Sequence, residues 1–138
     1  MTAPFVTSTS TEMIDRPRVH MWLSELSYWA RGRSRQTQDA AIDASRNYGV
    51  YHAETGEQVA YARVVTDGVT FAWLCDVFVA PEARGRGLGK MITAAVVEDL
   101  APLHLKRIML ATGDAHGLYA QHGFTALSDP AQMMARAG

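Results

Sequence analysis

One glycine-rich segment, Arg84–Lys90, constrains the fold of this chain more than any other feature. Its sequence is R-G-R-G-L-G-K, and it lies between an apolar run and a stretch whose apolar residues recur at helical spacing. Alternate glycines remove Cβ atoms where another group must approach the backbone, and a helix start supplies unpaired N–H groups and a partial positive charge. The segment therefore predicts a strand, a turn and a helix start that together hold an anion, for which a phosphate is expected.

The spacing of the glycines separates three phosphate-binding patterns. A dinucleotide fingerprint, G-x-G-x-x-G, would need glycine at Lys90, and a P-loop would need glycine at Arg84 and serine or threonine at Met91. Neither requirement is met. The pattern that remains is Q/R-x-x-G-x-G/A, which Arg84, Gly87 and Gly89 satisfy.

The chain before this segment shows first helical and then strand periodicity. Val19, Trp22 and Leu26 recur at helical spacing, and a second, weaker helix is expected over 37–45. Apolar residues then alternate with a period of two, and glycine turns separate the runs. The predicted strands cover 48–52, 59–65 and 69–79.

The third of these strands, 69–79, is apolar on both faces, so we expect it to be central and covered by helices on both sides. Residues 1–10 are expected to fray, and 11–14 could form a short strand. The elements expected after 69–79 are a helix from Leu88 that stops before Pro102, a strand over 107–112, a short helix capped by Asp114 and closed by Gly123, and a strand over 124–127. This order predicts one α/β (α+β) domain over residues 1–138, with a single mixed sheet.

A second motif, L-Y-x-x-x-G-F at Leu118–Phe124, follows the glycine segment. Together with the stretch Leu74–Gly89 it resembles the GNAT superfamily of N-acetyltransferases, over about the C-terminal half of the chain. The resemblance implies a central mixed, mostly antiparallel sheet flanked by helices on both faces. The chain departs from the pattern at Thr112, where many members carry Asn, and the cofactor contact there is in doubt.

The resemblance also implies the co-substrate, acetyl-CoA, and no metal. Backbone groups of Val77 and Val79 would pair with the pantetheine arm as an added strand would. The residues implied in pyrophosphate binding are Arg84, Gly85, Arg86, Gly87, Leu88, Gly89 and Lys90. The alternative is a glycine-rich strand-to-helix turn that binds nothing.

The implied reaction is direct attack of a neutral amine on the acetyl thioester, with Tyr119 as the acid for the leaving thiolate. The alternative for Tyr119 is an aromatic side chain packed on the sheet. A lysine-like ammonium has a pKa near ~10.4, so the site must take its proton, and a carboxylate is the usual base. The expected catalytic residues are therefore Tyr119 and Asp76.

Asp76 is the one carboxylate of its strand and is expected at the acceptor side, where it would bind a positive charge or remove a proton. The equal alternative is a buried Asp satisfied by backbone amides of a loop. Asp76 alternates with Val77, so only a bulge or twist could bring both to one site. The stretch is similar to the L-E-D-x-F-V of diamine acetyltransferases, but Cys75 replaces their Glu, which weakens a polyamine acceptor.

The segment 28–35 combines two aromatic residues with three arginines. Tyr28 and Trp29 could line the acceptor pocket together with Asp76, or they could form a surface loop that covers the core. The three arginines, Arg31, Arg33 and Arg35, could also contact nucleic acid, but no nucleic-acid motif accompanies them. We expect substrate binding by Tyr28, Trp29 and Asp76.

The composition limits the classes of partner that this chain is expected to bind. Thirteen Lys+Arg against fourteen Asp+Glu give a formal net charge of -1, which argues against nucleic acid and an anionic membrane as partners. A single cysteine and no recognisable signal segment favour the cytoplasm. The expected partner is a small-molecule or peptide amine, and a homodimer is left open. A catalytically silent acyl-CoA-binding regulatory module is the alternative function.

Overall fold

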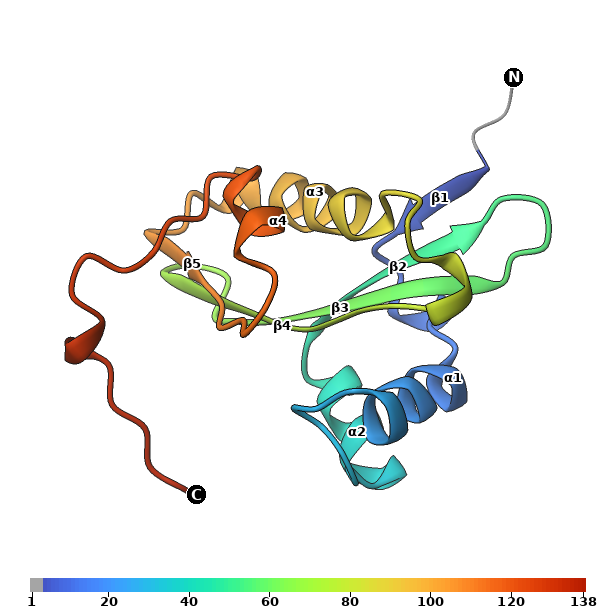
Figure 1. The fold of residues 1–138 in the computed structure, drawn as a ribbon, viewed down its shortest axis with the longest axis horizontal. Coiled ribbons are helices and arrows are strands. Elements are labelled where there is room, and N and C mark those ends of the chain that lie inside the picture. Colours follow the sequence, from blue (N-terminus) through green and yellow to red (C-terminus); the bar gives the residue numbers. More distant parts are fainter. Residues whose placement is uncertain (1–3) are drawn as a thin grey trace.

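The computed structural model describes residues 4–138, in which five strands form one sheet in the order β1-β2-β3-β4-β5 (Figure 1). The strands are β1 (Phe5–Ser8), β2 (Arg46–His52), β3 (Gln58–Thr66), β4 (Phe71–Val79) and β5 (Arg107–Met109). Strands β1 to β4 pair antiparallel, and β5 pairs parallel to β4. The mixed, mostly antiparallel sheet predicted from the sequence is confirmed.

Helices cover both faces of the sheet (Figure 1). One face carries α1 (Arg16–Met21), which continues as a π-helical segment (Trp22–Leu26), and α2 (Arg35–Asp43); the other carries α3 (Leu88–Leu100) and α4 (His116–Ala120). Short 3-10 turns lie at Thr11–Met13, Pro81–Ala83, Ala101–Leu103 and Pro130–Gln132. Within residues 4–138 no helix has both the length and the apolar character needed to cross a bilayer.

Two apolar layers hold the helices to the sheet. The side chains of α3 that are almost fully buried repeat at helical spacing and are Leu88, Ile92, Val96 and Leu100. Small residues on β3, Ala60 and Ala62, are also fully buried and let α3 approach closely. On the opposite face Trp22 stacks on Phe78 with ring centroids 5.6 Å apart.

The start of the chain differs from the prediction. Residues 5–8, expected to fray, form the edge strand β1, which pairs with Gly49–His52 of β2. Phe5 is buried and its ring meets His52 edge to face, so a long-range contact stabilises a segment without local periodicity. Residues 11–14 contain a 3-10 turn and no strand, and the predicted fraying of 1–3 lies outside the described residues.

The end of the chain differs as well. Residues 124–127 form no strand, and the chain after Phe124 runs away from the body as an exposed tail (Figure 1). Asp114 does not cap α4, because the N-cap is Ala115 and no side chain bonds there. The hydroxyl of Thr112 accepts a hydrogen bond from the Ala115 N–H at 3.0 Å instead, and so makes the local turn.

Strand β4 does not have the two fully covered faces that its sequence predicts. Its pairing with β5 stops at Trp73–Met109, after which the two strands separate. Ala72, Leu74 and Phe78 are buried, whereas Trp73, Cys75, Val77 and Val79 are only half-buried. These half-buried residues line two cavities, and helices do not cover them fully.

Candidate functional site

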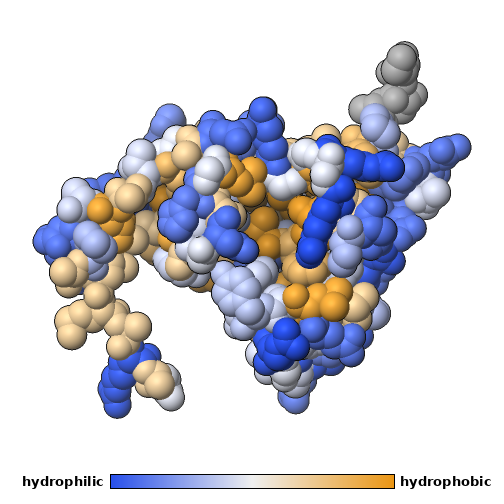
Figure 2. Space-filling view, in the orientation of Figure 1, coloured by the Kyte–Doolittle hydropathy of each residue, from blue (hydrophilic) through white to orange (hydrophobic). Residues whose placement is uncertain are grey.

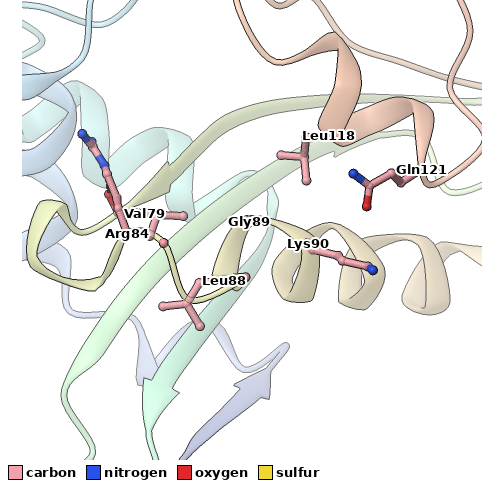
Figure 3. A pocket seen from close by; sticks show the side chains of 9 residues that line it. Val79, Arg84, Leu88, Gly89, Lys90, Leu118 and Gln121 are labelled. Carbon is pink, nitrogen blue, oxygen red and sulfur yellow. Dashed lines mark hydrogen bonds between the residues drawn. The ribbon is translucent and has the colours of Figure 1, made fainter.

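Two cavities follow one another along β4 and α4. The first encloses about 440 Å³ and is lined by Val79, Arg84, Gly85, Gly87, Leu88, Gly89, Lys90, Leu118 and Gln121 (Figure 3). The second, which we call the acceptor cavity, encloses about 610 Å³ between the 28–33 loop, β4 and the 110–115 loop. Neighbouring residues line different cavities: Val79 and Leu118 the first, Val77 and Tyr119 the second.

The glycine segment has the backbone geometry of an anion site. Gly85 and Gly87 have φ of +82° and +76°, a region that residues with a side chain rarely adopt. Gly87 is the N-cap of α3, so the first-turn N–H groups of the helix have no acceptor within it. A Cβ at Gly85 or Gly87 would meet no atom within 4 Å, so open space lies beside this backbone.

The charged side chains around the glycine segment differ in what they contact: some pack on other protein groups and some line the cavity. The Arg84 Nε donates to the Val79 carbonyl at 3.2 Å, and its guanidinium lies 5.3 Å from the Phe78 ring. Arg86 lies over the Phe5 ring and is not part of the cavity lining. Figure 3 shows Arg84 directed away from Lys90 and Gln121, which lie across Gly89 from it. Arg84 and Lys90 therefore line the cavity from opposite sides of Gly89.

A β-bulge in β4 turns Asp76 toward the acceptor cavity. Cys75 pairs with Arg63 of β3 and Phe78 pairs with Tyr61, so three steps on β4 oppose two on β3. Asp76 has φ of +54°, unusual for a residue with a side chain. The bulge that the sequence required for Asp76 and Val77 to share one site is present, and both line the acceptor cavity.

Asp76 accepts hydrogen bonds from three side chains. Arg33 Nη1 and Arg63 Nε donate to its Oδ2 at 2.8 and 2.9 Å, and Trp29 Nε1 donates to its Oδ1 at 2.9 Å. Burial alone would raise the pKa of Asp76, but the two guanidinium groups lower it below its ordinary value. Asp76 lies in the cavity wall as expected, but an ionised carboxylate with occupied oxygens is a poor proton acceptor.

This network is not the one that the sequence suggested. The alternative for Asp76 was a contact with backbone amides, whereas side chains from the 28–33 loop and from β3 satisfy it. We therefore assign Asp76 the role of positioning Trp29, Arg33 and Arg63. A role in proton removal stays a prediction that this geometry does not favour.

Replacing Asp76 by Asn is expected to lower the free energy of unfolding by about 3 kcal/mol at pH 7, because two half-buried guanidinium groups lose their carboxylate. The folded pKa is lowered, so this stability is present above the unfolded pKa of about 3.9 and is lost as pH falls through the folded value. Urea unfolding at pH 7 and below pH 4 measures both effects.

The exposed Asp114→Asn is the control for this comparison and should change stability by less than about 0.5 kcal/mol. Equal stability of Asp76→Asn and the wild type at pH 7 would show that the network does not hold the loop.

Tyr119 projects from α4 into the acceptor cavity and is largely buried. Burial raises its pKa to about 12, with the charge of Asp114 adding to the effect. No group within residues 4–138 makes a hydrogen bond to its hydroxyl, while its ring meets Phe124 edge to face at 6.0 Å. The hydroxyl is thus protonated at neutral pH and free to donate.

Tyr28 and Trp29 lie in the wall of the acceptor cavity, and substrate binding by them stays a prediction. Both are exposed, and their rings meet edge to face at 5.0 Å. The Gly113 N–H donates to the Tyr28 hydroxyl at 3.3 Å, so the aromatic loop reaches across to the 110–115 loop. Burial raises the pKa of Cys75 to about 11, so this lining thiol is protonated and not a nucleophile.

Several residues that line the two cavities were not predicted as site residues from the sequence. Arg63 and Trp73 enter the acceptor cavity from β3 and β4, and Leu118 and Gln121 line the first cavity. An arginine among apolar strand residues was the only signal for Arg63. No group of three or more His, Cys, Asp or Glu within the described chain is placed to hold a metal ion.

The comparisons with known proteins agree with this geometry. Residues 16–124 match the family model described as the acetyltransferase (GNAT) family. The chain is 40% identical to a Xanthomonas campestris pv. campestris protein whose crystal structure is described as belonging to the GNAT family, with a TM-score of 0.91, covering 100% of this chain and 96% of that one.

Two other proteins match over part of the chain. A Gibberella zeae protein named as an acetyltransferase is 41% identical over 73 residues, which are 52% of this chain and 41% of that protein. The chain thus spans less than half of the curated relatives that it matches. A Mycobacterium tuberculosis protein solved in complex with CoA superposes with a TM-score of 0.74 at 20% identity, covering 89% of this chain and 73% of that one.

Proposed function

Because this chain belongs to the acetyltransferase (GNAT) family, we propose that it transfers an acetyl group from acetyl-CoA directly to a primary amine. One observation carries the proposal: the cavity of the glycine segment at the start of α3 and the acceptor cavity are both lined by the part of β4 that β5 leaves unpaired, and the second holds a free tyrosine hydroxyl. Figure 2 shows apolar residues at the centre of this face, framed by hydrophilic ones.

The residues present fit coenzyme A. The free N–H groups from Gly87 to Lys90, together with the Lys90 ammonium, would bind its pyrophosphate. On the side of β4 that faces β5, the edge after Trp73 has no strand partner within residues 4–138. The backbone groups of Val77 and Val79 on this edge would pair with the pantetheine arm of coenzyme A. When bound, acetyl-CoA supplies an activated acyl group.

The protein groups then have two tasks. The aromatic loop with Tyr28 and Trp29 orients the acceptor amine beside β4. In the transfer an N–C bond forms, the thioester C–S bond breaks, the amine loses one proton and the thiolate gains one. Tyr119 donates a hydrogen bond to the developing thiolate, since a hydroxyl whose pKa is about 12 keeps its proton more strongly than a thiol of pKa about 8.5.

The direct test is thiol release from acetyl-CoA by the purified protein with a panel of amines. Release that depends on both the protein and an amine supports the proposal. Binding of coenzyme A without thiol release from any amine would instead support a silent acyl-CoA-binding module.

Coenzyme A is expected to raise the melting temperature specifically. A ligand at 100 times its dissociation constant stabilises the native state by about 2.7 kcal/mol. NAD and ATP should give much smaller shifts, because the glycine segment lacks their patterns. Differential scanning fluorimetry with each ligand checks this, and equal shifts from all three would contradict a specific coenzyme A site.

A further inference from the structure

Four charged side chains line the acceptor cavity: Arg33, Arg63, Asp76 and the exposed Asp114. Both guanidinium groups pair with Asp76, so these three groups together keep one positive charge, and Asp114 brings the net charge of the whole lining to zero. A carboxylate on the acceptor would therefore be attracted to the two arginines, whose charge Asp76 neutralises only in part.

The Arg63 guanidinium keeps part of its hydrogen-bonding capacity. Its Nε donates to Asp76 and its Nη1 donates to the Ser45 hydroxyl at 3.1 Å. Its Nη2 has no acceptor within residues 4–138, although Arg63 lines the cavity and its side chain is 14% exposed. Because Asp76 and Ser45 hold the rest of the group in place, the free N–H groups are fixed in direction, which suits a carboxylate.

The surroundings of Arg63 favour an apolar body for the same ligand. Val65 and Trp73 pair in register on β3 and β4 and lie on the same face of the sheet as Arg63. Trp29 and Tyr28 face the cavity from the opposite loop. The cavity thus combines aromatic walls with an immobilised guanidinium group, that of Arg63, which keeps a free donor.

We propose that the acceptor is an amino-acid-like amine: its carboxylate pairs with Arg63, and its aromatic or aliphatic body lies against Trp73 and the aromatic loop. This assignment rests on the proposed acetyl transfer and names its substrate class. Simple cationic amines, including polyamines, are then expected to be poor acceptors, because they lack a carboxylate.

The test compares amines that differ only in the carboxylate. Thiol release from acetyl-CoA is measured with phenylalanine against 2-phenylethylamine, tryptophan against tryptamine, and leucine against 3-methylbutylamine, with spermidine as a polycation. The carboxylate members should have kcat/KM about 10- to 100-fold higher, the range of a hydrogen-bonded charge pair. Equal or better use of the decarboxylated amines or of spermidine would overturn the assignment.

Variants at Arg63 test whether this residue causes the preference for carboxylate-bearing amines. Arg63→Gln leaves Asp76 paired with Arg33 and Trp29, so no buried charge is orphaned. It should raise KM for the carboxylate amines about 10-fold or more and change KM for the decarboxylated ones much less, so the preference is lost. Arg63→Lys keeps the charge but loses the planar fork and should fall between them. Arg35→Gln, an exposed arginine outside the lining, is the matched control.

A binding measurement separates this inference from the proposed transfer. Fluorescence of Trp29 and Trp73, with coenzyme A present, reports phenylalanine against 2-phenylethylamine without any turnover. Selective binding of phenylalanine that Arg63→Gln abolishes supports the carboxylate site even if no thiol is released. No selective binding in a protein that does acetylate amines refutes the site and leaves the transfer standing. An equal loss for both amines in Arg63→Gln and Arg63→Lys also refutes it.

Discussion

Replacing Tyr119 with Phe is expected to lower turnover about 10²–10³-fold, the scale of removing one hydrogen-bond donor from developing negative charge. The affinity for coenzyme A should stay the same, because Tyr119 lines the acceptor cavity and not the cavity of the glycine segment. The fold should also persist, since the ring contact with Phe124 is kept. Thiol-release kinetics and melting curves with coenzyme A measure the three quantities.

Tyr51→Phe is the matched control for this change. Tyr51 is also buried with a pKa raised to about 12, and its hydroxyl has no partner within the described residues, but it lines neither cavity. It should retain wild-type turnover. In the wild type no loss of rate from tyrosine ionisation is expected below about pH 11, because Tyr119 loses its proton only near its raised pKa of about 12. Wild-type turnover of Tyr119→Phe would reduce Tyr119 to a packing residue.

Gly87→Val is expected to abolish the coenzyme A melting shift. The side chain would enter the open space beside the free N–H groups, where no protein atom lies within 4 Å of the added Cβ. The φ of +76° adds strain of about 1–2 kcal/mol or more for a residue with a side chain. Stability therefore falls as well, and the effect of strain must be separated from the effect on binding.

Gly56→Val is the control that separates the effect of backbone strain from the effect on coenzyme A binding. Gly56 has the same φ of +76° and the same empty surroundings, but it lies in the turn between β2 and β3, away from both cavities. It should lose a similar amount of stability and keep the full coenzyme A shift. Loss of the shift in both variants, or in neither, would contradict the assignment of Gly87 to the pyrophosphate site.

The backbone geometry of the glycine segment could be predicted because its information is local. The glycines at alternate positions, the apolar strand before them and the helical spacing after them all lie within one stretch of chain. Their conformations follow from backbone sterics, and the positive φ of Gly85 and Gly87 is a direct consequence. The motif over Leu118–Phe124 placed Tyr119 on a short helix for the same reason.

The acceptor cavity could not be predicted to the same extent, because long-range contacts build it. Arg33, Arg63 and Asp76 come from a loop and two strands, and only the bulge in β4 turns the carboxylate toward the guanidinium groups. Strand β1 depends in the same way on β2, since an edge strand takes its partner from a distant segment.

The sequence alone thus predicted the family, the central strands of the sheet and the backbone geometry of the glycine segment, whose signals lie in short-range periodicity and backbone sterics. The tertiary structure decided which charged side chains meet at the acceptor cavity. Whether a buried carboxylate acts as a base or holds two arginines depends on which side chains surround it in space.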